Sequence, residues 1–126
     1  FNAVIVGAPL LDMKRYSKML AGASWIGEYG DPDKPEDWAY LKKYSPYHNL
    51  KMDKKYPKVF FVTSIKDDRV HPGHARKMAA KMADMNHPYF YHETIEGGHI
   101  AASTNKQKAE MKALIFTYLN QLLNKK

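Results

Sequence analysis

Residues 58–71 read Lys-Val-Phe-Phe-Val-Thr-Ser-Ile-Lys-Asp-Asp-Arg-Val-His. The first part, Lys58 to Ser64, is rich in β-branched and aromatic side chains and therefore predicts a β-strand. A polar loop follows up to His71. Pro72 then opens a segment whose methionines recur at the spacing of one helix face, at Met78, Met82 and Met85. This helix is expected to run to about Met85, because Pro88 disfavours helical geometry in the residue before it and the sequence Asn86-His87-Pro88 therefore ends the helix.

Two other strands are predicted on either side of this unit. Residues 3–7 read Ala-Val-Ile-Val-Gly, a short apolar run that is typical of a parallel strand buried on both faces. Residues 89–95 form the third expected strand, and a turn over residues 96–99 follows it. Ser103 or Thr104 then caps a last helix that reaches about Leu123. The expected buried stripe of this helix consists of Met111, Leu114, Ile115, Tyr118, Leu119 and Leu122.

The segment between the first two strands is expected to be an elaborated connection. A polar helical stretch is predicted over residues 13–20. Residues 21–53 are rich in Gly, Pro, Trp and Tyr and predict at most short helices, one of them over residues 35–44. Pro35 suits a first helical turn, and the two acidic residues that follow it are favourable at the positive end of a helix.

The order of these elements is typical of an α/β fold. Strands alternate with helices, which implies right-handed crossovers and a parallel sheet with helices on its faces. A chain of 126 residues is long enough for one small domain and not for two. We therefore predict an α/β unit over residues 1–126 with about three parallel strands and flanking helices.

Composition argues against several classes of function. The net charge is +7, but the lysines are scattered and no basic run is interleaved with aromatic residues, so nucleic-acid binding is not predicted. No run approaches the roughly 20 apolar residues that a membrane-spanning helix needs, so no membrane partner is predicted either. Cysteine is absent, which removes disulfides and thiolate chemistry but leaves the choice between cytoplasm and periplasm open.

The ends of the second and third predicted strands carry the candidate chemistry. Asp67 and Asp68 follow one strand, and His99 follows the other. Catalytic groups gather at the carboxyl ends of parallel strands, so an aspartate and His99 are expected at the same edge of the sheet. A carboxylate beside an imidazole fixes the tautomer of the ring and stabilises its charged form during proton transfer. The alternative is that both segments are ordinary turns that satisfy their own backbone groups.

The order of these two residues matches the end of a Ser, acid, His triad in α/β-hydrolases. The nucleophile of such enzymes lies in a Gly-x-Ser-x-Gly turn, and residues 1–126 contain no such pattern. We therefore expect the serine upstream of Phe1, in a part of the catalytic domain that these residues do not include.

Five segments, in order and at the same spacing, resemble those of one known family. They are Gly7 to Met13, Trp25 to Gly30, Lys43 to Asn49, Asp67 to Val70 with Pro72, and Gly98-His99. The chain resembles the prolyl oligopeptidase family of serine peptidases along its whole length, from the first strand to the final helix. The sequence Lys-Tyr-Ser-Pro followed by His-Asn makes this resemblance specific, because it is not a general hydrolase pattern.

The resemblance implies a fold and a set of roles. The fold would be the C-terminal part of an α/β-hydrolase domain with its last three strands, which a β-propeller normally accompanies. Asp67 would be the triad acid and His99 the general base. Arg69 would bind a backbone carbonyl of the peptide substrate. The substrate's proline ring would stack on Trp25, in a pocket that is also lined by Tyr29, Val70 and Leu10.

Two departures from the family pattern broaden the predicted specificity beyond proline. Ile100 stands where relatives often have glycine, and the residues around Trp25 differ from those of proline-specific members. Trp25 and Tyr29 could also be plain core aromatics, and Arg69 a solvated loop charge. No cofactor is expected. No metal is expected either, because His71 and His74 have a ligand-like spacing without an evident third ligand.

The predicted function is that of a C-terminal fragment of a serine peptidase, inactive alone because the serine lies elsewhere. One alternative is a non-catalytic binding or interaction module with a hydrolase-like fold. Another is a related esterase or acylaminoacyl-type hydrolase. In the intact domain the first strand would pair on both sides, with the rest of the catalytic domain as one partner. We therefore expect the isolated fragment to self-associate through residues 3–7 or the surface around them.

Overall fold

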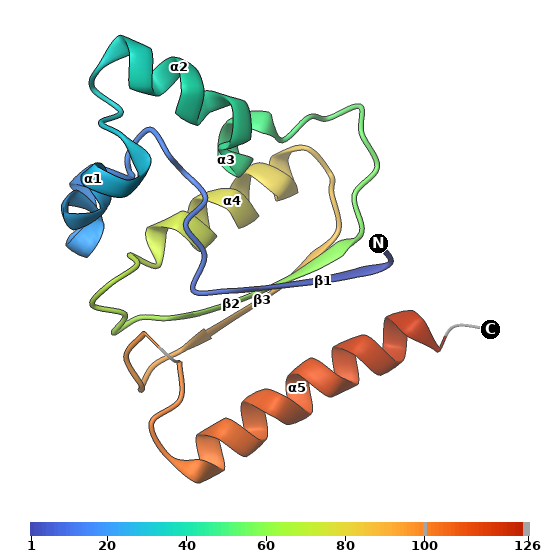
Figure 1. Ribbon diagram of the computed structural model, residues 1–126. Helices are drawn as coiled ribbons and strands as arrows, with labels where there is room; N and C mark the ends of the chain where they lie inside the picture. Colours follow the sequence, from blue (N-terminus) through green and yellow to red (C-terminus); the bar gives the residue numbers. More distant parts are fainter. Residues whose placement is uncertain (100, 125–126) are drawn as a thin grey trace.

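A computed structural model describes residues 1–99 and 101–124 of the chain, and it contains a parallel three-stranded sheet. The strands are β1 (Ala3–Gly7), β2 (Lys58–Ser64) and β3 (Tyr89–Thr94), in the spatial order β1-β2-β3. β2 pairs in parallel with both neighbours, and the helices cover the two faces of the sheet (Figure 1). The predicted α/β architecture, a partial α/β-hydrolase fold with three parallel strands, is confirmed.

The register of the sheet brings the two candidate loops together. Ser64, the last residue of β2, pairs with Thr94, the last residue of β3. Both strands therefore end at the same level, and the segments that follow them leave from one edge of the sheet. β1 ends slightly earlier along this edge, because Gly7 pairs with Val62.

The two faces of the sheet carry separate apolar cores, because alternate strand residues point to opposite sides. On one face Phe61 packs with Met78 and Met82 of α4 (Gly73–Asp84), near the short helix α3 (Pro46–Asn49). On the other face, Phe60 packs with Tyr118 of α5 (Asn105–Leu123). Each large side chain buried in this way contributes roughly 1.5–3 kcal/mol to the stability of the fold.

The last helix begins at a capping box and ends as predicted. The Thr104 hydroxyl accepts from the Gln107 N–H at 3.2 Å, and Gln107 Oε1 accepts from the Thr104 N–H at 3.0 Å. The predicted buried stripe is wrong at Leu114, which is 42% exposed. Leu114 instead lines a surface hollow beside β3 together with Phe90.

The connection between β1 and β2 corrects one prediction. Residues 13–20 do not form an α-helix, and the chain instead makes two 3₁₀ helices, η1 (Tyr16–Lys18) and η2 (Leu20–Trp25). The backbone turns so tightly here that a Cβ on Gly22 would lie 1.7 Å from the Tyr16 carbonyl oxygen. Short helices follow as expected, namely α1 (Ile26–Tyr29) and α2 (Pro35–Tyr44), the latter with the predicted bounds.

The strand β1 is an edge strand of the described sheet and not the fully buried strand that its apolar sequence predicts. Ile5 is 36% exposed, and Gly7 is exposed as well. The reason is that β1 pairs only with β2 among the described residues, so one of its sides carries no neighbouring strand.

No helix within the described residues has the length and apolar character needed to cross a membrane. The family departure expected at Ile100 lies outside the described residues.

Candidate active site

The loops that follow β2 and β3 bring Asp67 and His99 into contact. His99 Nδ1 lies 3.1 Å from Asp67 Oδ1 and 3.0 Å from Oδ2. The Asp67 side chain is fully buried, whereas the His99 ring is 35% exposed. In this arrangement the buried carboxylate orients the imidazole ring through Nδ1. The other ring nitrogen, Nε2, is then available to other molecules.

Backbone amides of its own loop hold the Asp67 carboxylate. Its Oδ1 accepts from the N–H groups of Arg69 and Val70, each at 2.9 Å. The Asp67 N–H in turn donates to the Ser64 carbonyl at 3.3 Å. Asp68 is exposed and makes no such contacts within the described residues. The structure therefore separates the two adjacent aspartates, with Asp67 turned inward to His99.

The contact with Asp67 determines what His99 can do chemically. Nδ1–H donates to the carboxylate, which leaves Nε2 of the neutral ring as a proton acceptor. Within the described residues Nε2 has no hydrogen-bond partner. An imidazole with this tautomer and an open Nε2 can remove a proton from a nucleophile placed before it.

The remaining candidate residues fall into two groups. Arg69, which is exposed, and Val70, which is buried, lie two and three residues after Asp67, and their amides hold its carboxylate. The other three are half-buried around Met13, Tyr16 and Leu41, and they are Leu10, Trp25 and Tyr29.

A close contact joins the η1–η2 turn to the start of α4. A Cβ on Gly73 would come within 3.0 Å of Met19 Cε and 2.8 Å of His71 Nδ1. The Met19 side chain therefore lies against the segment that directly follows Val70.

Comparison with known proteins places the chain in a family. Residues 1–126 match the prolyl oligopeptidase family over their full length. The chain belongs to the prolyl oligopeptidase family. It is 53% identical over 123 residues to the uncharacterized peptidase y4nA of Sinorhizobium fredii, a match that covers 98% of this chain and 17% of that protein.

Solved structures of the prolyl oligopeptidase family share this fold. A post-proline cleaving enzyme from Rickettsia typhi matches with a TM-score of 0.94 and 39% identity, over 98% of this chain and 18% of that one. Prolyl oligopeptidase B from Galerina marginata, bound to a 35-residue substrate, matches with a TM-score of 0.87 and 27% identity over the same shares. The chain thus spans less than a fifth of these relatives.

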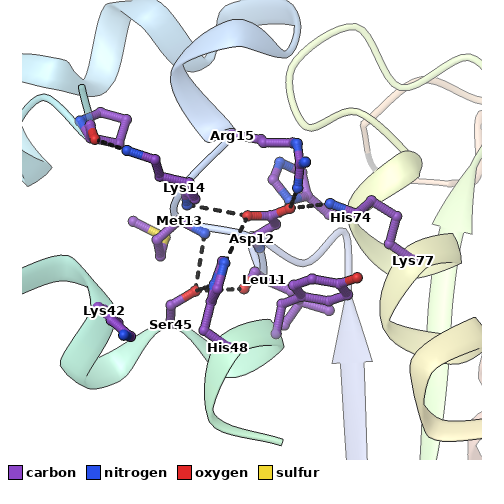
Figure 2. Close-up of polar contacts among 12 residues, drawn as sticks. Leu11, Asp12, Met13, Lys14, Arg15, Lys42, Ser45, His48, His74 and Lys77 are labelled. Carbon is purple, nitrogen blue, oxygen red and sulfur yellow. Dashed lines mark hydrogen bonds and ion pairs between the residues drawn. The ribbon is translucent and has the colours of Figure 1, made fainter. Parts of the chain in front are cut away.

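A buried polar cluster around Asp12 is a feature that the sequence analysis missed (Figure 2). Asp12 has no exposed surface, and its carboxylate accepts from Lys77, from Arg15 at 3.4 Å and from the Lys14 N–H at 3.2 Å. The Asp12 N–H donates to His74 Nδ1 at 3.1 Å. The cluster therefore fastens the loop after β1 to α4. The available signal was an aspartate inside the otherwise apolar run of residues 10–13.

Ser45 and His48 extend this cluster to α3. Ser45 Oγ lies 2.8 Å from His48 Nδ1 and accepts from the Met13 N–H at 3.2 Å. His48 Nε2 is 3.9 Å from Asp12 Oδ1. The Ser-Pro and His-Asn pairs that mark the family pattern thus belong to the framework that supports the loop after β1.

Burial and charge set the protonation of this cluster. Burial works to raise the pKa of Asp12, yet the hydrogen bond from Lys77 and the nearby positive charges hold it below its usual value. Burial lowers the pKa of His74 to about 4, so its ring is neutral near pH 7. Burial also lowers the pKa of His48.

The two histidines that have a ligand-like spacing do not converge on one point. His74 Nδ1 accepts from the Asp12 N–H, and His71 Nδ1 accepts from the Gly73 N–H at 2.9 Å. Among the described residues no group of three or more His, Cys, Asp or Glu side chains could hold a metal ion.

Proposed function

We propose that residues 1–126 supply the acid and the base of a serine peptidase, and that another part of the same polypeptide supplies the nucleophilic serine. The observation that carries this proposal is the contact between the buried Asp67 carboxylate and His99 Nδ1 at 3.0 Å. It lies at the strand edge where α/β enzymes carry their catalytic groups. The small share of the relatives that the chain spans is consistent with a serine elsewhere.

The proposed mechanism is acyl transfer. His99 Nε2 takes the proton of the serine hydroxyl as its oxygen attacks the scissile carbonyl carbon, and Asp67 stabilises the imidazolium that forms. The tetrahedral intermediate collapses, His99 gives the proton to the leaving amine, and an acyl-enzyme remains. Water, activated by the same histidine, then adds to the acyl carbonyl, and loss of the serine releases the acid and restores the hydroxyl.

We assign the peptide-binding roles to the two groups of residues around this pair. The Arg69 guanidinium is exposed and can donate to a substrate carbonyl in a fixed direction. The half-buried rings of Trp25 and Tyr29 pack with Leu10 in one apolar cluster, which suits a compact, uncharged ring such as proline. We assign the buried Val70 to the same pocket. The post-proline cleavage named for the Rickettsia typhi enzyme supports this choice of substrate.

The proposal is tested in the full natural polypeptide that contains residues 1–126. Hydrolysis of a chromogenic peptide with proline before the leaving group should fall roughly 10⁴-fold or more in His99→Ala. His92→Ala is the matched control, since His92 lies within β3 and outside both loops, and it should keep wild-type activity. Undiminished activity of His99→Ala would refute the assignment. A correctly folded wild-type polypeptide without hydrolytic activity would favour the interaction-module alternative.

A further inference from the structure

The hydroxyl of Ser64 joins the loop that carries Asp67 to the loop that carries His99. Ser64 is the last residue of β2 and is 1% exposed. Its Oγ–H donates to the Gly97 carbonyl, two residues before His99. The same oxygen accepts from the Lys66 N–H at 3.2 Å, one residue before Asp67. One buried hydroxyl thus donates a hydrogen bond to the loop that carries His99 and accepts one from the loop that carries Asp67.

The backbone around Gly97 has little room to adjust. Gly97 has φ +87°, and a Cβ at this position would lie 2.7 Å from the Ala102 nitrogen. The turn that follows closes with a hydrogen bond from the Ala101 N–H to the Gly98 carbonyl at 2.9 Å. Ala101 also takes a positive φ of 59°, which is unfavourable for a residue with a side chain. The backbone at Gly97 is therefore closely constrained, and this constrained residue is the one that accepts the bond from Ser64.

Two polar attachments of this turn, besides the exposed bond from Gln107 Nε2 to the Glu96 carboxylate at 3.2 Å, differ in charge. One is the contact between His99 and Asp67, in which the charge of the ring changes as Nε2 gains and loses a proton. The other is the bond from Ser64 to Gly97, which is made by a buried hydroxyl and carries no charge. Because its partners do not change their charge, this second attachment can hold the turn in place throughout a reaction cycle.

We infer that Ser64 is a positioning residue. It holds the turn that carries His99 in the position in which Nδ1 faces the Asp67 carboxylate. The inference rests on the proposed function, in which that contact is catalytic. Ser64 does not touch the reacting atoms. It acts through the Gly97 carbonyl, and a displacement of the imidazole by about 1 Å is enough to lower the rate on the order of 100-fold.

The neighbouring residue Thr63 provides a matched control. It lies in the same strand and is 1% exposed, as Ser64 is. Its side chain points to the opposite face of the sheet, and its hydroxyl has no hydrogen-bond partner within the described residues. Thr63→Val therefore removes a buried hydroxyl from the same strand end without removing a contact to either loop.

The test measures kcat and KM for a proline peptide in the full natural polypeptide. Ser64→Ala should lower kcat roughly 10- to 100-fold and leave KM within about twofold, because the loss falls on the proton transfer and not on substrate binding. Ser64→Thr keeps the hydroxyl and should recover most of kcat. Thr63→Val should change neither constant more than about twofold.

Several results would overturn the inference while leaving the proposed function intact. They are wild-type kcat in Ser64→Ala, a rise in KM that accounts for the whole loss, or an equal loss in Thr63→Val. Should Ser64→Ala fail to fold, Ser64→Cys takes its place, because it keeps the size of the side chain with only a weak donor. The same drop in kcat is then expected, and wild-type kcat would again refute the role. Failure of the proposed function is seen separately, as hydrolysis that does not depend on His99.

Discussion

His99 Nδ1 lies 3.0 Å from Asp67 Oδ2 although the two residues are 32 positions apart in the sequence. The contact exists because β2 and β3 are neighbours that end in register, Ser64 opposite Thr94. Each loop then adds its own constraint, with amides around the Asp67 carboxylate and a tight turn around Gly97. The pairing of the strands brings the two residues close together, and the loops orient their side chains.

The two adjacent aspartates should differ in their effect on catalysis. Asp67→Asn in the full natural polypeptide keeps the size of the side chain but favours the wrong tautomer of His99, so kcat should fall roughly 10⁴-fold. Asp68→Asn is the control and should leave kcat within about twofold, since Asp68 is exposed and not in contact with the ring. Steady-state kinetics on a proline peptide decide the matter. Equal losses in the two variants would contradict the assignment of Asp67.

The Asp12 cluster should make the free energy of unfolding depend on pH in the acidic range. The folded-state pKa of Asp12 is lowered, so its contribution is present above the unfolded value of about 4 and is lost as the pH falls through the lower folded value. Asp12→Asn should lower the free energy of unfolding by about 3 kcal/mol near neutral pH, because it leaves Lys77 without its buried partner.

Chemical denaturation from pH 7 down to pH 3 tests this directly. The difference between wild type and Asp12→Asn should be constant above about pH 5 and shrink below about pH 4. Asp33→Asn removes an exposed ion pair with Lys18 and should change stability little at any pH. A difference that grows as the pH falls would show that the sign of this linkage is wrong.

Substitution of Trp25 should affect the hydrolysis of peptides more than the hydrolysis of simple esters. Trp25→Ala removes the proposed stacking surface, so KM for a proline peptide should rise several-fold while hydrolysis of a short acyl ester changes little. Trp38→Ala, in the same apolar cluster, is the control for a loss of activity that comes only from poorer packing of this cluster. Faster turnover of the ester than of the peptide by the wild-type polypeptide would instead favour the esterase alternative.

The isolated residues 1–126 should self-associate and should not hydrolyse peptides. β1 has a bare edge within the described sheet, and Ile5 on it is 36% exposed. Sedimentation should show concentration-dependent association that Ile5→Lys weakens, whereas Met52→Lys, at an exposed residue away from the sheet, should not. A single monomer at high concentration would refute the association, and His99-dependent hydrolysis by the isolated chain would refute its inactivity.

Much of this arrangement could be predicted because it depends on local sequence. The apolar runs of the strands, the capping residue Thr104 and the positions of Asp67 and His99 at strand ends all follow from patterns within a few residues. The prediction for residues 13–20 failed because the close approach of Gly22 to the Tyr16 carbonyl is a packing effect that helical periodicity does not contain. Likewise, the exposure of β1 depends on which strands lie beside it and not on its own composition.

The polar contacts that join distant segments were beyond sequence reasoning. The bond from Lys77 to Asp12 spans 65 positions, and that from Ser64 to Gly97 spans 33. No spacing rule identifies such partners, because each depends on how two elements pack in three dimensions. In the sequence alone, Ser64 cannot be distinguished from other strand residues. Its contact becomes apparent only from the position of the Gly97 turn in the folded chain.

In the proposed function, these residues supply the acid and the base while the nucleophile lies in another part of the polypeptide. Labelling of the full natural polypeptide with a fluorophosphonate, followed by mass spectrometry of the labelled peptide, tests it most directly. We predict one labelled serine outside residues 1–126, with labelling abolished in His99→Ala and retained in His92→Ala. A labelled serine within residues 1–126, or labelling that persists without His99, would contradict it.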